Sequence, residues 1–155
     1  MFKEMRRRDR ELSNVETEEL LLKGTYGILS MNGDNDYGYG VPLSYVYTNG
    51  SIYLHCAIEG QKLNRIRGDN KVSFCVVGEA TPLPDIFAMK YTSAIAFGKA
   101  GEVDGDEKMT ALIAFVKKYS TEEYLEKGRQ YAETAFQKTV LIKIAVEHLT
   151  GKGRK

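Results

Sequence analysis

Long apolar runs are absent from this sequence. No stretch approaches the roughly 18–20 apolar residues that a membrane-spanning helix needs, and the charged N-terminus has no apolar segment behind it of the kind found in secretory signals. Only two cysteines occur, Cys56 and Cys75, which fits a reducing cytoplasm better than a disulfide framework. These absences predict a cytoplasmic protein with no membrane partner.

Strong net charge and the common nucleotide and metal motifs are also missing. A net charge of +1 provides no global field for nucleic acid. The sequence contains neither the Gly-x-Gly-x-x-Gly fingerprint nor a phosphate-binding loop ending in Gly-Lys-Ser/Thr. The two histidines, His55 and His148, have no cysteine, histidine or carboxylate neighbours at the spacing of metal ligands. We therefore predict no metal site and no nucleic-acid partner.

Six β-rich segments alternate with turn signals along the chain. The Asn49-Gly50 pair between two of them is a strong hairpin signal. The length, with 43% apolar and 28% charged residues, suits one globular domain over residues 1–155. The pattern predicts an α+β fold, a six-stranded antiparallel β-barrel with peripheral helices. The predicted strands are 25–32, 39–48, 51–57, 71–80, 91–103 and 138–146.

Helical signals lie mostly near the two ends of the chain. Ser13 and Glu16 form a capping-box pattern that opens a short helix closed near Gly24. A second short helix is expected at 61–68, and two longer ones at 106–120 and 120–136. The first of these longer helices should bury one apolar line, formed by Met109, Leu112, Ile113 and Val116. Residues 80–90 are expected to form a surface loop, and 148–155 a polar, basic tail.

A glycine followed by a basic helix start is the most informative local feature. Gly60 precedes Gln61 and Lys62, and Arg65 and Arg67 follow shortly after. Backbone amides exposed at such a turn, together with a lysine in the first turn, would suit a phosphate. Solvated charges on an amphipathic helix explain the same pattern equally well. The residues alone leave both interpretations open.

The order of motifs resembles a known family. The pattern PLSYVY…IYLHCAxxGxKLxxIRxxxKVSFxVVG is similar to the core of the nitroimidazole-resistance, flavin-nucleotide-binding proteins, within the pyridoxamine 5'-phosphate oxidase-like superfamily. MRRRDREL near the start, KYTSAIAFGKAGEV in the middle and EHLTGKGRK at the end resemble it too. The resemblance runs from about Met5 to Lys155.

This resemblance implies an FMN-binding split β-barrel that forms a homodimer with flavin, FMN or FAD, at the interface. It places Pro42, Leu43, Ser44 and Tyr45 along the flavin ring, and His55, Cys56 and Ala57 beside the ring and the ribityl chain. It places Gly60, Gln61 and Lys62 at the phosphate, where Lys62 would be the main side-chain partner. It also brings Lys152 and Arg154 toward the same phosphate or the partner chain.

Two departures from the family pattern limit what is carried over. Many relatives have asparagine where this chain has Ser44. Authentic pyridoxamine-phosphate oxidases end in an Arg-Leu-x-Pro type motif, whereas this chain ends in TGKGRK. The resemblance therefore supports flavin binding without implying oxidation of vitamin B6.

His55 is the candidate catalytic residue. One interpretation has it facing the cofactor, where an imidazole that titrates near neutrality would orient an electron acceptor or shuttle a proton. The other makes it an inert, hydrogen-bonded residue on the open face of a strand. Cys56 shares a strand face with apolar residues, which favours a small buried hydrophobe over a reactive thiol.

Three functions remain open at this stage. The first is a flavin-dependent reductase of small acceptors such as nitroaromatic compounds, in which the flavin performs the redox chemistry. The second is a flavin carrier or sensor without turnover. The third is a small barrel that binds single-stranded nucleic acid on aromatic residues, which the near-neutral charge disfavours.

Overall fold

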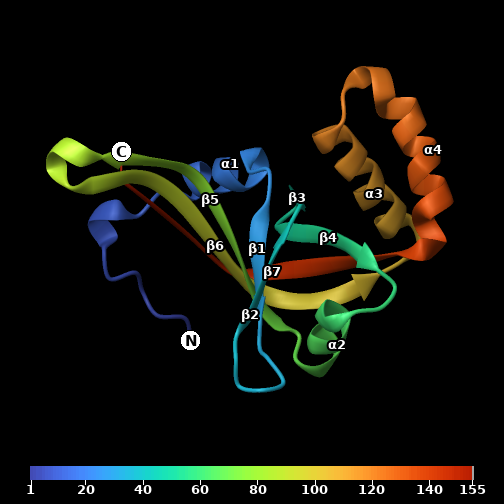
Figure 1. Cartoon of the computed structure of the whole chain (residues 1–155), viewed down its shortest axis with the longest axis horizontal. Helices are drawn as coiled ribbons and strands as arrows, with labels where there is room; N and C mark the ends of the chain where they lie inside the picture. Colours follow the sequence, from blue (N-terminus) through green and yellow to red (C-terminus); the bar gives the residue numbers. More distant parts are fainter. Residues whose placement is uncertain (155) are drawn as a thin grey trace.

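A single antiparallel sheet with four α-helices forms this protein, in a computed structural model that describes residues 1–154 (Figure 1). The α+β prediction is confirmed. The strands are β1 (Gly27–Met31), β2 (Tyr39–Leu43), β3 (Val46–Thr48), β4 (Ser51–Ala57), β5 (Lys71–Leu83), β6 (Ala88–Val103) and β7 (Thr139–Arg154). The helices are α1 (Asn14–Lys23), α2 (Gln61–Gly68), α3 (Gly105–Tyr119) and α4 (Leu125–Ala135), with 3-10 turns η1 (Arg8–Arg10), η2 (Pro84–Ile86), η3 (Glu122–Tyr124) and η4 (Phe136–Lys138).

The prediction of six strands is wrong by one. The expected strand 39–48 leaves the sheet at Ser44 and Tyr45, and so divides into β2 and β3. The sheet order is β2-β1-β5-β6-β7-β4-β3, which puts these two strands at opposite edges although only two residues join them. The sheet must therefore curve until its edges approach. No backbone pairing closes β2 onto β3 among residues 1–154, so the predicted barrel is a curved, open sheet.

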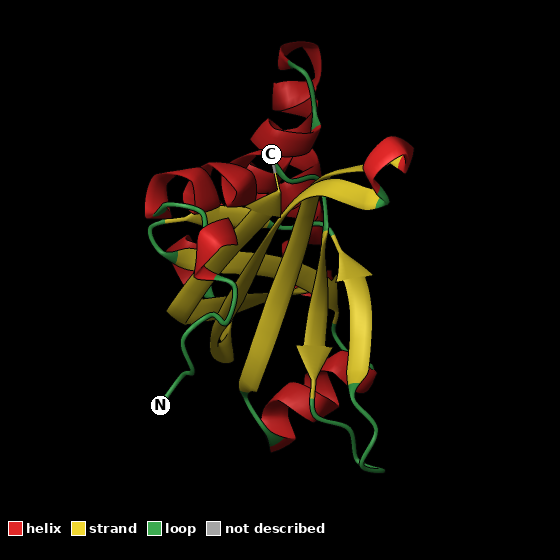
Figure 2. Ribbon diagram, turned by 90° about the vertical axis from the view of Figure 1, so that its left-hand side faces the viewer, coloured by secondary structure: helices red, strands yellow, loops and turns green. Residues whose placement is uncertain are grey.

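Two hydrophobic clusters stabilise the molecule. The larger lies on the concave side of the sheet and includes Leu21 of α1 and Leu63 of α2. The smaller lies between the other side of β4 and the α3–α4 pair, with Phe115 and Leu141 among its members. Figure 2 shows the helices arranged around the sheet. Both sides of β4 are therefore covered from Ser51 to Leu54, one by the main core and one by α3, whereas His55 and Ala57 at its end are exposed.

The segment 80–90 is an extended hairpin, which corrects the predicted loop. Strand β5 continues to Leu83, the turn η2 follows, and β6 begins at Ala88. Phe87 at the tip has φ 51° and is exposed. In Figure 1 this hairpin extends away from α3 and α4. The predicted polar tail is also a strand. It forms the second half of β7, because His148 to Arg154 pair with Phe97 to Tyr91 of the long strand β6.

Helix α3 uses two faces instead of the single predicted one. Its buried residues are Lys108, Ala111, Leu112 and Phe115. The last three belong to the smaller hydrophobic cluster, between α3 and the sheet. Val116, from the predicted line, instead faces α4, where a Cβ added at Gly128 would overlap it. Because α3 packs on the sheet and on α4, its apolar surface is wider than one helical line.

Candidate functional site

The end of β4 and the start of α2 bring most of the predicted phosphate-side residues together. β4 is held in register by β7, with His55 opposite Leu141 and Ala57 opposite Thr139. The chain then turns through Gly60 into α2. Gly60 has φ 140° and ψ 171°, a conformation essentially restricted to glycine, and an added Cβ there would meet nothing within 4 Å. The glycine is therefore required by backbone conformation and leaves open space in front of the helix.

The N-terminus of α2 is available to an anion. Gly60 is its N-cap, and no side chain caps the first turn. The first backbone N–H groups of a helix have no partner within the helix and carry its positive dipole end. Lys62, in this first turn, is half-buried and has no ion-pair partner within residues 1–154. The geometry therefore fits a phosphate group.

The other two basic residues of α2 are engaged elsewhere. Arg65 donates from Nη1 to the backbone oxygen of Asn32 at 3.1 Å, and its guanidinium lies 4.6 Å from the ring centroid of Tyr39. Arg67 pairs with Glu102 at 2.6 Å. The predicted trio of cations therefore separates, and Lys62 is the member left to bind a ligand.

His55 and Cys56 lie on opposite faces of β4. The ring of Phe115 meets His55 edge-on, with centroids 4.7 Å apart and planes at 75°. Burial lowers the pKa of His55, and the charge of Lys62 lowers it further. Cys56 packs against the main core, and burial raises the pKa of its thiol. His55 therefore touches α3 through one ring edge while its side chain remains exposed, and Cys56 behaves as a core residue.

We expect a titration of His55, followed by NMR, to give a pKa below 6.5, and the Lys62→Met variant to move it upward. The unfolded chain then binds a proton more readily than the folded protein, so this residue should reduce stability as pH falls below about 6.5 toward the folded pKa. Urea unfolding across this pH range checks the sign. A His55 pKa unchanged by Lys62→Met would contradict the proximity of the two groups.

Residues 42–45 turn in different directions. Pro42, on the edge strand β2, and Ser44 are exposed, and Leu43 is half-buried. Tyr45 is fully buried: its hydroxyl donates to the backbone oxygen of Leu21 at 2.5 Å, and its ring meets Phe74 edge-on at 5.0 Å. The side chain of Tyr45 is therefore part of the core, and the outward surface of this segment is formed by Pro42 and Ser44.

Lys152 and Arg154 lie far from Lys62 within one chain. Lys152 pairs with Ser93 and Arg154 with Tyr91, at the opposite end of β7 from Thr139. At roughly 3.3 Å per residue, the thirteen residue steps from Thr139 to Lys152 span up to about 40 Å. Figure 1 shows the C-terminus on the far side of the sheet from α2. The structure does not bring these two cations to the phosphate-side residues of the same chain.

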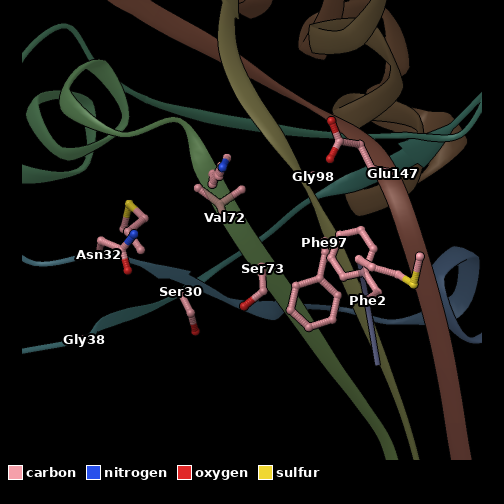
Figure 3. Close-up of a pocket in the computed structure, with 12 residues that line it drawn as sticks. Phe2, Ser30, Asn32, Gly38, Val72, Ser73, Phe97, Gly98 and Glu147 are labelled. Carbon is pink, nitrogen blue, oxygen red and sulfur yellow. The ribbon is translucent and has the colours of Figure 1, made fainter. Parts of the chain in front are cut away.

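A sizeable cavity lies elsewhere on the sheet. It has a volume of about 660 Å³, and its lining includes Ser30, Ser73, Phe97 and Phe2 (Figure 3). Phe2 stacks on His148 with centroids 4.5 Å apart and separates this cavity from a second one of about 340 Å³. Neither is lined by His55 or Lys62. The predicted site therefore lies outside both cavities, on a part of the surface where His55, Ala57 and Gln61 are exposed.

Sequence reasoning missed two residues that touch the predicted site. Lys118 and Tyr119, in the last turn of α3, form hydrogen bonds to the backbone of Tyr45. They lie more than 70 positions from it in the sequence. No local pattern joins them, so only the packing of α3 reveals the contact.

Comparisons with known proteins identify a matching family model and structures of similar fold. The family model described as pyridoxamine 5'-phosphate oxidase matches residues 13–153. A search of curated proteins found no significant match.

Within residues 1–154, no helix is long and apolar enough to cross a membrane, and no group of three or more histidine, cysteine or acidic residues is placed to hold a metal ion.

Solved structures with the same fold include proteins described as binding flavins. One from Bacteroides thetaiotaomicron, provisionally described as a 5-nitroimidazole antibiotic resistance protein, has a TM-score of 0.80 at 22% identity, covering 92% of this chain and 85% of its own. An FAD-binding protein from Mesorhizobium loti has a TM-score of 0.66 at 21% identity, covering 94% and 98%. The flavocytochrome Anf3 from Azotobacter vinelandii has 0.79 at 16% identity, covering 98% and 72%. At these identities the likeness establishes a shared fold.

Proposed function

Because the chain belongs to the pyridoxamine 5'-phosphate oxidase family, we propose that it binds a flavin nucleotide, FMN or FAD. We further propose that it acts as a flavin-dependent reductase of small acceptors such as nitroaromatic compounds. The observation that carries the cofactor proposal is the uncapped first turn of α2, with Gly60 in a glycine-only conformation and Lys62 unpaired within the described chain. These groups fit a phosphate.

The chain's own residues have distinct proposed roles. Gly60, Gln61 and Lys62 hold the phosphate through backbone amides and one ammonium group. Pro42 and Ser44 lie along the ring, with Leu43 behind them, and His55 and Ala57 border the site from the end of β4. Cys56 and Tyr45 support this surface from the core side. A bound flavin would supply reversible electron transfer, for which no acid or base of the protein is strictly required.

A homodimer would complete the site. The phosphate-side residues form an open surface in one chain, and Lys152 and Arg154 are separated from them along β7. These two cations would therefore reach only a flavin held by a second copy. Val77 and Ile95 also expose apolar surface on the side of the sheet where Phe2 lies, which a partner would cover. Both observations support a dimer with the cofactor between its subunits.

The proposed acceptor rests on a narrower basis. The neighbour from Bacteroides is described in connection with nitroimidazole resistance, and the open surface beside His55 leaves room for a small planar molecule. The neutral imidazole that its lowered pKa favours would accept a hydrogen bond from an acceptor or donate one to it.

The experiment that tests the proposal starts with the visible absorbance spectrum of the purified protein. We expect a flavin spectrum, or its appearance after FMN or FAD is added, and chromatography of the heat-released cofactor will identify which nucleotide is bound. A reduced nicotinamide cofactor and a nitroaromatic compound then test turnover. Tight flavin binding without turnover for any donor and acceptor would favour the carrier or sensor function. Failure to bind either nucleotide would remove the proposal.

A further inference from the structure

The connection between β2 and β3 lacks the hydrogen bonds of a sheet. Backbone groups that leave a ladder and become buried need other partners. The backbone N–H of Tyr45 donates to the Tyr119 hydroxyl oxygen at 2.9 Å. Its carbonyl accepts from the Lys118 ammonium at 2.9 Å and from the Tyr119 hydroxyl at 2.7 Å. The last turn of α3 therefore provides the partners that the sheet does not.

Lys118 is placed more specifically than a solvated surface lysine. Its Nζ lies 3.8 Å from the ring centroid of Tyr45 and 5.2 Å from that of Tyr119. It is half-buried and has no carboxylate partner among residues 1–154. Burial lowers its pKa to about 8. Because partly desolvating a cation is unfavourable, the carbonyl and the two rings must offset that loss.

Tyr119 extends the same contact to the neighbouring residues. Its hydroxyl also lies 2.8 Å from the backbone oxygen of Thr25, just before β1, so its single proton is donated either to this oxygen or to that of Tyr45. One hydroxyl group thus connects α3 with the start of β1 and, through the backbone of Tyr45, with the β2–β3 connection. A shift of α3 would move Ser44 relative to the rest of the sheet.

We propose that Lys118 and Tyr119 are positioning residues that fix the Ser44–Tyr45 connection in the orientation that contacts the flavin ring. This inference rests on the proposed flavin binding, and it gives the α3–α4 pair a role in recognising the ring. The two residues act through the backbone of the connection, whereas Lys62 acts on the phosphate. Loss of either positioning residue should therefore affect every ligand that carries the ring.

The test compares Tyr119→Phe and Lys118→Met with Tyr53→Phe. The control removes a hydrogen bond of similar length from the other end of the same helix, because the Tyr53 hydroxyl donates to Glu107 at 2.7 Å. FMN and riboflavin, which has no phosphate, are titrated against each protein, with flavin fluorescence and the visible absorption band recorded.

We expect Tyr119→Phe and Lys118→Met each to weaken both ligands about tenfold, the loss of roughly one charge-assisted or buried hydrogen bond, and to shift the band of the bound ring. Lys118→Arg, which keeps a cationic donor over the Tyr45 ring, should bind within about threefold of the wild type. Tyr53→Phe should change neither affinity nor spectrum.

Two results would overturn the inference. In one, the wild-type protein binds flavin, but Tyr119→Phe and Lys118→Met bind both ligands as Tyr53→Phe does. In the other, hydrogen exchange of the Tyr45 amide accelerates in Tyr119→Phe while flavin affinity and spectrum stay unchanged, which assigns the contacts to stability alone. A wild-type protein that binds no flavin is a different result, because it removes the proposed function and this inference with it. If Tyr119→Phe does not fold, Lys118→Met with its arginine rescue decides the question.

Discussion

Replacing Lys62 with methionine is expected to weaken FMN binding roughly 10- to 150-fold, equivalent to about 1.5–3 kcal/mol for a hydrogen bond to a charged group. The ammonium group lies in the first turn of α2, beside the open conformation of Gly60, and has no ion-pair partner within residues 1–154. Methionine keeps much of the side-chain length and removes only the charge. Flavin fluorescence titration measures the change.

The same variant should bind riboflavin as the wild type does, because riboflavin has no phosphate for Lys62 to contact. Arg67→Met is the matched control: it removes a cation from the same helix, but one already paired with Glu102, and should leave FMN affinity within about twofold. Thermal unfolding of the flavin-free Lys62→Met protein should change little, since surface substitutions usually alter stability by less than about 0.5 kcal/mol. Equal loss of FMN and riboflavin would show that Lys62 does not act on the phosphate.

The second large effect is expected at Tyr45, which should behave as a residue of the core. Its side chain is fully buried against Phe74, and its hydroxyl donates to the Leu21 carbonyl at 2.5 Å. Truncating a large buried aromatic residue to alanine usually costs about 3–5 kcal/mol. Tyr45→Phe leaves that carbonyl without its partner and should cost about 1–3 kcal/mol. Urea unfolding of the flavin-free protein gives both values.

Gly24 provides an independent check on this packing. A Cβ added there would overlap the Tyr45 hydroxyl oxygen and Val76, so Gly24→Ala should destabilise the protein by about 1–3 kcal/mol. Removing the hydroxyl relieves part of this overlap, so the double variant Gly24→Ala/Tyr45→Phe should be more stable than the sum of the single effects predicts. Strictly additive effects would contradict the contact.

Several features were predictable from the sequence because neighbouring residues determine them. The capping box of Ser13 and Glu16 is present as expected, with both reciprocal hydrogen bonds. Asn49 and Gly50 have φ 49° and 69° and connect β3 to β4 as a tight hairpin. Gly60 and Lys62 lie together at the start of α2 because they are two positions apart. The order of these motifs also led to the family, which the match over residues 13–153 confirms.

Other features depend on which distant segments meet. The strand expected at 39–48 divides because β2 pairs with β1 while β3 pairs with β4, and no signal at Ser44 marks that change of partner. The loop expected at 80–90 becomes a hairpin because β5 and β6 continue to pair beyond a bulge. Propensity in that segment, with its two prolines, favours a loop, and the continued backbone pairing of β5 with β6 up to Leu83 and Ala88 overrides it.

The sequence by itself determined the capping box, the Asn49-Gly50 hairpin, the family and the composition of the candidate phosphate site, because caps, tight turns and the residues of one helix turn act over a few positions. Only the tertiary structure decided that Tyr45 is a core residue, that Arg65 and Arg67 are engaged elsewhere, and that Lys152 lies at the far end of β7 from Ala57. It also revealed the contact of Lys118 and Tyr119 with the β2–β3 connection. These outcomes depend on burial and on contacts between segments far apart in the chain, for which a single sequence carries no local signal.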